Sequence, residues 1–437
     1  MTEEKPKKEE IPKEDKTPLE KHVQKEIDKK SFCSISTLTK TNTLKAPFPI
    51  RLNYEQLICK FSDKFLSGFQ IRDSGIYCLK KDIVEKQSGI IKEVIAALTK
   101  CIWTGGVMSL SLPIRIFEPR SMLERITDWF SFAPILLTKA GGVGNKIEAF
   151  KYVVAFSLSA LFRSSEQLKS LNPMLGETYQ CEWEDGSKMY LEHTCHTPPI
   201  SHFYIKSSNN LFRVSGYVDM EMGGIMKAML TNTMQIIPKG RITVYLPETE
   251  QKIDFQFPKI TMGGALWGER YMYFSDHMKF EDRGNNLKCV IAFANNRKEL
   301  KGKRIHDIYG RIFNYNYVEN LDDPKDPFYS DSMSSHPFPL YNKEIVSEIT
   351  GSWLEEIKFD NKVYFNIKDA SQPQIYPCKT VLDSDSRYRE DKQWLQLSWD
   401  NKEKSKLYEE YAQAWKLALE AQQRYERGLR KEYANQQ

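Results

Sequence analysis

The spacing of apolar side chains changes along the chain, and each spacing predicts a different kind of element. Between residues 88 and 106 the apolar positions recur every three or four residues, which predicts one amphipathic helix that ends at Gly105 and Gly106. Its apolar stripe consists of Ile91, Val94, Ile95, Leu98 and Ile102. Because such a stripe usually lies over a core, we expect this helix to cover an apolar interior. Two further helical sets follow, around residues 122–130 and 146–162.

From about residue 177 to residue 315 the apolar side chains alternate with period two, as at Phe212, Val214 and Val218. Clusters of turn residues interrupt this pattern, for example SSNN at residues 207–210. Many consecutive strands without intervening helices predict an antiparallel sheet or barrel. A later hairpin is expected over residues 353–367 with Asp360-Asn361 at its turn, and residues 401–434 are expected to form one long charged helix.

The ends of the chain differ from this body in composition. Residues 1–45 are rich in Lys, Glu and Pro and hold too few apolar side chains to offset the entropy of ordering, so we expect a disordered charged tail. Residues 46–87 regain aromatic and aliphatic side chains, and we expect an N-terminal extension that packs on the main body.

Charge and composition narrow the classes of function. The 63 basic and 58 acidic residues leave a net charge of +5, which is too small to indicate a nucleic-acid-binding protein. A faintly basic surface is compatible with transient peripheral contact with anionic membranes. No stretch approaches the roughly 20 apolar residues of a membrane-spanning helix, and the N-terminus is charged, so we expect a soluble cytoplasmic protein. The eight cysteines include no Cys-x-x-Cys pair, and we expect reduced thiols that mostly fill the core.

Four potential metal ligands lie close together in the sequence, namely His193, Cys195, His196 and His202. A metal site needs ligands that converge on one ion, but this stretch ends in a Pro-Pro pair and lacks zinc-finger spacing. A Cys195–His196 nucleophile is disfavoured as well, because neighbours on a strand point to opposite faces. We therefore expect no metal and no cofactor, and a metal-dependent hydrolase at His193, Cys195 and His196 is an alternative hypothesis.

Lys416, Glu420 and Arg424 step by four on the expected C-terminal helix and therefore share one side of it. An exposed ladder of ion pairs is the interpretation that this spacing favours when it is taken alone. The same residues also suit a receptor for a phosphate ester, because Arg offers a planar fork and Lys a compact point charge.

Two stretches resemble signature motifs of the oxysterol-binding protein family. Residues 169–179 (KSLNPMLGETY) are similar to the family pattern Lys-Pro-Leu/Phe-Asn-Pro-Leu-Leu-Gly-Glu-Thr-Tyr and depart from it mainly at Ser170 and Met174. Residues 192–199 (EHTCHTPP) resemble the fingerprint Glu-Gln-Val-Ser-His-His-Pro-Pro, with Thr197 at the second histidine. Further similar blocks are SLSLPIRIFEPRSMLERI, LWGERYMYFSDHMKFED and the C-terminal helix, so the resemblance covers residues 88–434.

This resemblance implies an α+β fold, with a large incomplete antiparallel β-barrel around a hydrophobic tunnel, an N-terminal amphipathic lid helix and a helical C-terminal extension. It assigns residues 88–434 to a lipid-binding domain, with the lid at 88–112, helices at 113–165, the barrel at 170–370 and C-terminal helices at 375–434. By position, it also implies a phosphoinositide headgroup site. The residues of that site are Lys169, Asn172, His196, Thr197, Lys416, Glu420 and Arg424.

The function that the resemblance implies is lipid transfer. The expected ligands are one sterol or phosphatidylserine and, in competition, phosphatidylinositol 4-phosphate, which a monomeric protein would exchange between membranes or at membrane contact sites. The alternative is a lipid-responsive sensor or scaffold that binds the same ligands without net transport. Neither function is enzymatic.

Overall fold

The computed structural model describes residues 69–86, 112–165, 168–223, 231–264, 268–293, 303–314, 344–370 and 373–436. These residues belong to two compact units, which are divided between Gln413 and Ala414. The expected charged tail and the expected lid, with Ile91, Val94, Ile95, Leu98 and Ile102, lie outside the described residues. Within the described ranges, no helix has both the length and the low polarity that crossing a bilayer requires.

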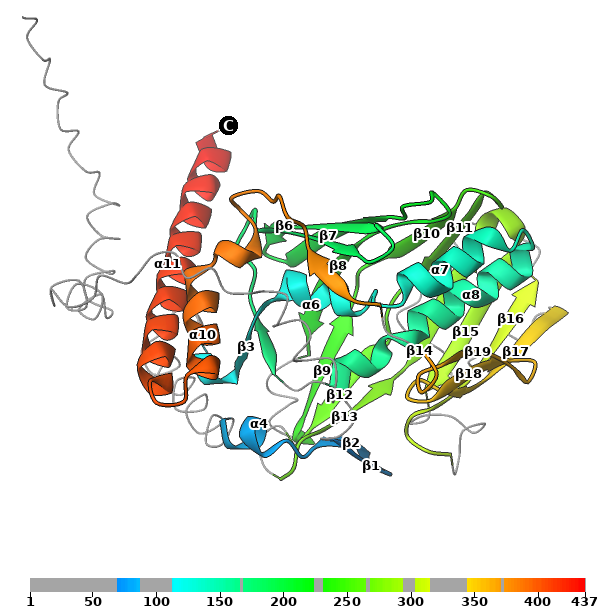
Figure 1. Ribbon diagram of the computed structural model, residues 1–437, viewed down its shortest axis with the longest axis horizontal. Helices are drawn as coiled ribbons and strands as arrows, with labels where there is room; N and C mark the ends of the chain where they lie inside the picture. Colours follow the sequence, from blue (N-terminus) through cyan, green and yellow to red (C-terminus); the bar gives the residue numbers. More distant parts are fainter. Residues whose placement is uncertain are drawn as a thin grey trace, which may run out of the picture. The chain divides into compact units, whose positions relative to one another are not determined.

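A short helix, α4 (Lys81–Lys86), is followed by three further α-helices, namely α6 (Met122–Asp128), α7 (Ala133–Gly142) and α8 (Lys146–Ser159). Ser121 and Glu124 form a capping box that begins α6, in which the Glu124 carboxylate accepts a 2.7 Å hydrogen bond from Ser121 N. Asn145 begins α8, because its Oδ1 accepts from the backbone N–H groups of Ile147 and Glu148, each at 3.0 Å. Helices α7 and α8 pack side by side and cross one face of the sheet (Figure 1).

One 18-stranded sheet contains all the described strands except β3 and β4, and its pairings are antiparallel. We call one run of neighbouring strands the stem, which consists of β20 (Ile375–Pro377), β5 (Thr178–Trp183), β6 (Lys188–His196), β7 (Pro199–Lys206) and β8 (Arg213–Met222). The first wing continues from β8 through β9 (Thr233–Pro238), β12 (Lys259–Gly263), β13 (Tyr271–Ser275), β2 (Gly75–Cys78) and β1 (Phe69–Arg72).

The second wing also starts from β8. It runs through β10 (Ile242–Leu246), β11 (Gln251–Phe255), β14 (His277–Asp282), β15 (Leu287–Phe293), β16 (Asp307–Asn314), β17 (Glu344–Ser352), β18 (Glu356–Phe359) and β19 (Lys362–Asn366). No pairing among the described strands joins the free ends of the stem and the two wings. The expected fold class, an incomplete antiparallel barrel with helices after it, is therefore confirmed, whereas the lid is not described.

The sheet divides at β8, and we call this place the fork. The first half of β8 pairs with β10, while its last three residues pair with β9. The neighbouring strands are interrupted beside this place. Residues 256–258 separate β11 from β12, and Asp276 separates β13 from β14. Gly240 lies between β9 and β10, where a Cβ atom would overlap the Tyr217 carbonyl oxygen. Only glycine permits so close an approach of two backbones.

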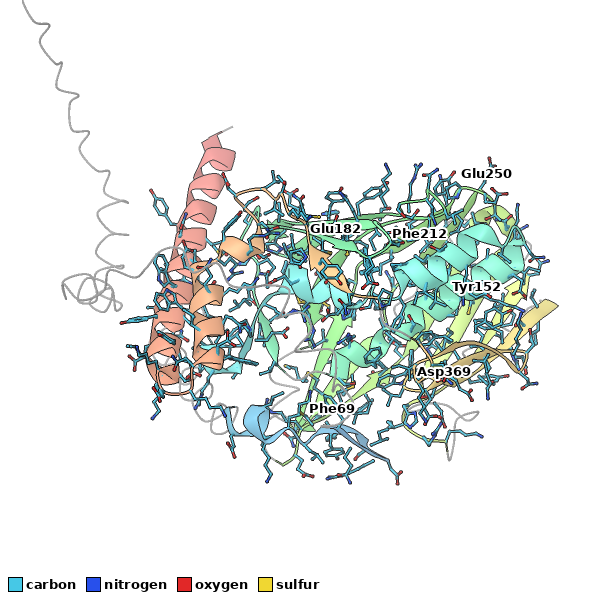
Figure 2. All side chains as sticks on the ribbon, in the orientation of Figure 1. Phe69, Tyr152, Glu182, Phe212, Glu250 and Asp369 are labelled. Carbon is cyan, nitrogen blue, oxygen red and sulfur yellow. The ribbon has the colours of Figure 1, made fainter. Side chains whose placement is uncertain are left out.

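Side chains alternate between a buried and an exposed face along the stem. In β6, Met189 and Leu191 are buried, whereas Lys188 and Tyr190 are exposed. The same alternation in β7 and β5 confirms the period-two pattern of the sequence. Figure 2 labels Tyr152 on α8, the buried Phe212 just before β8, and Glu250 in the turn after β10.

A second, smaller core lies beside the sheet. Here β3 (Phe117–Ser121) and β4 (Lys169–Leu171) form a short parallel pair, and helix α10 (Glu390–Asp400) packs on β3. The side chains of this core are Ile114, Phe117, Leu171, Leu395 and Ala412. Ala412 belongs to the long helix α11 (Ser405–Gln436), whose residues up to Gln413 belong to the larger unit and whose residues from Ala414 on belong to the other.

One hairpin agrees with the expectation from the sequence, and three short strands do not. The expected hairpin is confirmed, because β18 and β19 pair across Asp360 and Asn361, which both have positive φ. In contrast, residues expected in an N-terminal extension supply β1 and β2 to the sheet, and Ile375–Pro377 forms β20 instead of helix. These strands have three or four residues, too few for their alternation to be recognised from sequence.

Candidate functional site

The two signature stretches, residues 169–179 and 192–199, are joined directly by backbone hydrogen bonds. Gly176 N donates to the His193 carbonyl oxygen at 2.8 Å, and His193 N donates to the Glu177 carbonyl oxygen at 2.9 Å. The pairing continues into β5 and β6, where Thr178 lies opposite Glu192. The stretches are therefore one hydrogen-bonded substructure, although β5 and the following turn separate them in the sequence.

Lys169 and Asn172, both expected in the headgroup site, lie together. Lys169 Nζ donates to Asn172 Oδ1 at 2.5 Å and to the Ser170 carbonyl oxygen at 3.2 Å. The same ammonium lies 4.9 Å from the centre of the Phe117 ring, which belongs to the paired strand β3. These contacts hold the cation at the start of β4, beside a half-exposed signature stretch.

The Glu177 carboxylate is the buried centre of this region. It accepts hydrogen bonds from Met174 N at 2.8 Å, Ser386 Oγ at 2.7 Å and Arg389 Nη1 at 2.8 Å, and also from Ser121 Oγ. The four donors come from three parts of the chain, so this one side chain connects β3, the first signature stretch and the segment before α10.

Arg389 extends this connection. Its Nη1 also donates to the Asn172 carbonyl oxygen at 2.7 Å, and its Nε and Nη2 donate to the Asp391 carboxylate at 3.0 and 2.7 Å. Burial alone would lower the pKa of Arg389, but the charges of Glu177 and Asp391 outweigh it and hold the pKa above its usual value. Arg389 therefore remains cationic and fixes the backbone at Asn172.

Neither the contribution of Arg389 nor the role of Glu177 could be predicted from the sequence. Glu177 falls within a motif, but a motif does not say whether a residue contacts a ligand or supports its neighbours. Arg389 lies more than two hundred residues further along in a charged segment, and nothing in its local sequence distinguishes it from an exposed arginine.

His193 and His196 form a pair, with His193 Nε2 and His196 Nδ1 at 3.2 Å. The other ring nitrogen of His193 lies 3.0 Å from Ser201 Oγ on β7. Burial lowers the pKa of His193 to about 4, with further contributions from His196 and Arg389. His193 is therefore neutral at physiological pH, and its contact with His196 helps to fix the orientation of that half-buried ring.

Hydrogen bonds engage both ring nitrogens of His193, and Cys195 lies opposite Ile200 after a register shift. Among the described residues, no group of three or more His, Cys, Asp or Glu side chains has a metal-binding arrangement. Thr197 is exposed in the tight turn between β6 and β7, where His196 lies opposite Pro199.

Lys416, Glu420 and Arg424 lie on α11, in the compact unit that includes residues 414–437. Lys416 Nζ and Glu420 Oε1 are 2.8 Å apart, which confirms that the i,i+4 spacing produces an ion pair. The two cations differ in exposure, because Lys416 is only 4% exposed whereas Arg424 is an exposed residue. Such burial is unusual for an ion-pair ladder on an exposed helix face.

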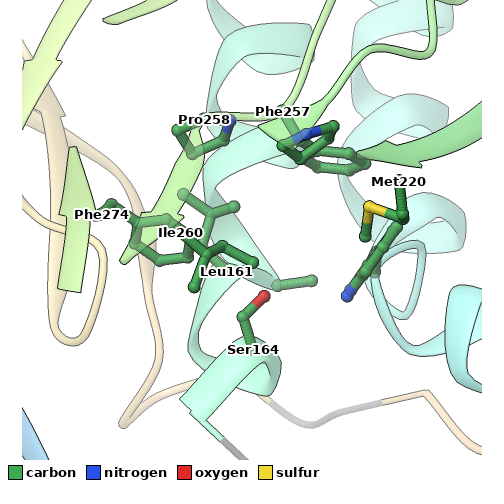
Figure 3. Close-up of a pocket in the computed structure, with 10 residues that line it drawn as sticks. Leu161, Ser164, Met220, Phe257, Pro258, Ile260 and Phe274 are labelled. Carbon is green, nitrogen blue, oxygen red and sulfur yellow. The ribbon is translucent and has the colours of Figure 1, made fainter. Parts of the chain in front are cut away.

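An apolar pocket lies at the fork, where about 270 Å³ of space, part of it open to solvent, lies among the lining side chains. Met220 and Pro238 come from β8 and β9, and Phe257 and Pro258 come from the break between β11 and β12. The remaining lining residues are Trp129, Ala160, Leu161, Ser164, Ile260 and Phe274. Figure 3 shows the labelled side chains around this space. The division of the sheet therefore produces a hollow that suits an apolar group.

Comparison with known proteins gives consistent results. Residues 93–323 match the family model described as Oxysterol-binding protein. The chain is 28% identical over 362 residues to oxysterol-binding protein 9 of Dictyostelium discoideum, covering 80% of this chain and 79% of that protein. It is 30% identical over 223 residues to human oxysterol-binding protein-related protein 1, covering 49% of this chain but only 22% of that longer protein.

Two solved structures show the same fold. The Osh3 ORD of Saccharomyces cerevisiae, solved in complex with PI(4)P, has a TM-score of 0.56 at 19% identity and covers 77% of this chain and 84% of its own. The Osh1 ORD domain, solved in complex with ergosterol, has a TM-score of 0.56 at 15% identity and covers 87% of this chain and 88% of its own.

The Glu177–Arg389 pair leads to a prediction about stability. Replacing Glu177 with Gln leaves the Arg389 charge buried with one fewer anionic partner, and breaking a buried pair in this way costs about 3–5 kcal/mol of the free energy of unfolding. The control is Glu355→Gln, which breaks the exposed pair with Arg304 and should cost about 0–1 kcal/mol. Urea denaturation of both variants measures the difference, and equal losses would show that the buried pair has no special role.

The lowered pKa of His193 predicts a pH dependence. The unfolded chain binds a proton at this histidine below about pH 6.5, whereas the folded chain does so only near pH 4, so stability falls as the pH drops through this range. Between about pH 7.5 and pH 4.5 the wild type should lose about 2 kcal/mol more free energy of unfolding than His193→Gln. His202→Gln, at an exposed histidine of β7, is the control for replacing an imidazole by an amide in the same part of the sheet. Parallel slopes for wild type and His193→Gln would contradict the assignment.

Proposed function

The chain belongs to the oxysterol-binding protein family, and on this premise we propose that it is a lipid transfer protein. In this proposal the protein holds one sterol or phospholipid in its barrel and exchanges it for phosphatidylinositol 4-phosphate. The main observation behind the proposal is that backbone hydrogen bonds among Gly176, Glu177 and His193 join the two signature stretches. The apolar pocket at the fork supports it, because a lipid chain gains about 0.8 kcal/mol for each CH₂ group that leaves water.

The headgroup requires polar and cationic partners. We propose that Lys169, Asn172, His196 and Thr197 contribute to its binding from the signature stretches, and that Lys416, Glu420 and Arg424 contribute from α11. The low exposure of Lys416 and its ion pair with Glu420 support a rigidly held cation, which is the property that a phosphate receptor needs. Thr197 keeps a hydroxyl donor where the family has a second histidine, so His196 is the only imidazole at this turn.

In this proposal the protein works as a cytoplasmic monomer that visits anionic membranes, and no catalytic step is involved. A sensor or scaffold would bind the same lipids without moving them. A transfer assay between two liposome populations separates the two functions, because only a carrier moves the lipid from donor to acceptor.

The expected lid gives one prediction. Deleting residues 88–106 removes the stripe of Ile91, Val94, Ile95, Leu98 and Ile102, which we propose closes the mouth of the barrel. The deletion variant should still fold but should lose bound lipid to water much faster than the wild type, as measured by lipid retained after gel filtration. Unchanged retention would show that this segment has another role.

The headgroup site gives a second prediction. The variant Lys416→Glu/Arg424→Glu replaces attraction to a phosphate by repulsion, and the loss of one charged hydrogen bond of about 1.5–3 kcal/mol lowers affinity about tenfold or more. Competitive extraction from liposomes should therefore show loss of phosphatidylinositol 4-phosphate with retained uptake of sterol or phosphatidylserine.

The matched control is Lys406→Glu, which reverses an exposed cation on the same helix outside the ladder. It should extract both lipids at wild-type levels. If the folded double variant also extracts the phosphoinositide normally, the ladder is an ordinary ion-pair ladder and this part of the proposal fails.

A further inference from the structure

The outer face of the sheet carries a row of like charges. Residues that pair directly across neighbouring strands share one face of a sheet. Here such pairs form one line, which consists of Lys188 on β6, Lys206 on β7, Arg213 on β8, Tyr245 on β10 and Lys252 on β11. The four cations are exposed, and we call this line the basic row. Figure 1 shows these strands side by side, and a strand spacing of about 4.8 Å makes the row about 19 Å long.

The basic row has little compensating charge. Lys188 Nζ lies 3.7 Å from Glu182 Oε2, and the Arg213 guanidinium donates a 2.9 Å hydrogen bond to a neutral side-chain amide. Within the described part of the chain, Lys206 and Lys252 form no ion pair. Because like charges directly opposite each other destabilise a sheet, the row lowers the stability of the fold.

A neighbouring cation on the same face is paired in the ordinary way. Arg241 shares this face of β10 with Tyr245 and forms an ion pair with Asp254 of β11. The Asp254 carboxylate also accepts a 2.6 Å hydrogen bond from Thr243 Oγ1. The basic row thus retains charge that the sheet neutralises directly beside it, and charge that is retained at a cost in stability points to a ligand.

Two exposed tyrosines border the basic row. Tyr190 and Tyr204 lie directly opposite each other on β6 and β7, two positions along from Lys188 and Lys206 and on the same face. They are 42% and 39% exposed. Tyrosine is enriched at protein interfaces because its ring offers apolar contact area and its hydroxyl a hydrogen bond. The face therefore combines cations with aromatic contact area.

Exposed acidic side chains lie on both sides of the basic row. Glu184 and Asp185 occupy the turn before β6, and Glu248 and Glu250 occupy the turn between β10 and β11. On the other side of the row, Glu192 is exposed at the far end of β6. An anionic membrane is a broad plane and would meet these carboxylates together with the row, whereas a single extended chain meets the row alone. The arrangement therefore favours a narrow anionic ligand.

We propose that this face docks an extended acidic segment of a partner protein, whose carboxylates bind the basic row and whose remaining side chains pack on Tyr190 and Tyr204. An extended chain covers about 19 Å with about six residues, and alternate side chains then face the row. Lys and Arg supply charge-assisted hydrogen bonds to such carboxylates. The inner side chains of the same strands, such as Leu191 and Phe203, belong to the core, so the segment binds outside the barrel. The inference is independent of the proposed lipid-transfer function.

The probe for this site is a fluorescein-labelled peptide of alternating Glu and Thr, about eight residues long, which places its carboxylates on one side when it is extended. Its control peptide has Gln in place of each Glu. Fluorescence anisotropy measures binding to the full-length protein. The wild type should bind the Glu peptide, more weakly as the salt concentration rises, and should not bind the Gln peptide measurably.

The variant Lys206→Glu/Arg213→Glu should bind the Glu peptide about tenfold or more weakly, because each reversal turns an attraction into a repulsion. The matched control is Lys362→Glu/Lys368→Glu, which makes the same change in net charge at two exposed lysines at or beside β19. It should bind the peptide as the wild type does.

Two further variants separate a binding role from a structural one. Lys206 lies between two cations, so Lys206→Glu should raise the midpoint of urea denaturation while it weakens peptide binding. A row without a ligand predicts no loss of binding. Tyr190→Thr/Tyr204→Thr keeps residues that favour strands and should weaken binding several-fold at low and at high salt concentration.

Sedimentation with phosphatidylserine liposomes tests the membrane as the occupant. The variant Lys206→Glu/Arg213→Glu should sediment with the liposomes to the same extent as Lys362→Glu/Lys368→Glu. A selective loss of liposome binding in the first variant would assign this face to a membrane and overturn the inference. Equal binding of the Glu and Gln peptides, or wild-type peptide affinity in the first variant, would overturn it as well. Lipid extraction is a separate measurement, so a failure of the lipid-transfer proposal is distinguished from a failure here.

Discussion

The structure around the signature stretches depends on one buried carboxylate. Glu177 accepts hydrogen bonds from the segment before α6, from its own loop and from the segment before α10, and its charge is balanced by Arg389. A buried ion pair is not in itself strongly stabilising, because desolvation offsets much of the attraction. Its effect here is on position: Arg389 also fixes the Asn172 carbonyl oxygen, and the Glu177 carbonyl oxygen fixes His193. The exposed Asn172 and the half-buried His196 are therefore held by a buried network of hydrogen bonds.

The apolar side of the molecule depends on a different constraint, the close approach of backbones at the fork. Gly240 lies against Tyr217, and each successive strand pair is interrupted at the same level. A continuous barrel of this size would fill its interior with side chains or enclose one long channel. The interruption instead exposes Met220, Phe257 and Ile260 to a local hollow that the ends of α6 and α8 close. The irregular residues at the fork thus both end the strands and leave the space that forms the pocket.

Sequence patterns predicted the regular parts of this structure well. Helices α6 and α8 and the alternating strands of the stem follow from hydrophobic periods, and the Asp360-Asn361 turn follows from the tolerance of these residues for positive φ. The resemblance of the signature stretches predicted the fold class that the solved relatives share. The assignment of Lys169, Asn172, His196 and Thr197 to a headgroup site remains a prediction.

Other features could not be read from sequence because they depend on contacts between distant segments. Arg389 has no local signature, and its role follows only from its contact with Glu177. The basic row is likewise a property of strand pairing, since the sequence does not show which exposed cations of different strands lie opposite one another. Strands β1, β2 and β20 were missed because three or four residues do not establish a period.

The fork has a consequence for how such a protein can diversify. In a continuous sheet, a residue inserted into one strand shifts the register of every strand beyond it. Here β9, β12 and β13 are separated from β10, β11 and β14 by irregular residues that can absorb such a shift. The first wing, which supplies Ile260 and Phe274 to the pocket, can therefore accumulate insertions and side-chain changes while the hydrogen-bond register of the second wing is preserved. Part of the pocket lining and the hydrogen-bond register of the second wing are thus determined by separate parts of one sheet.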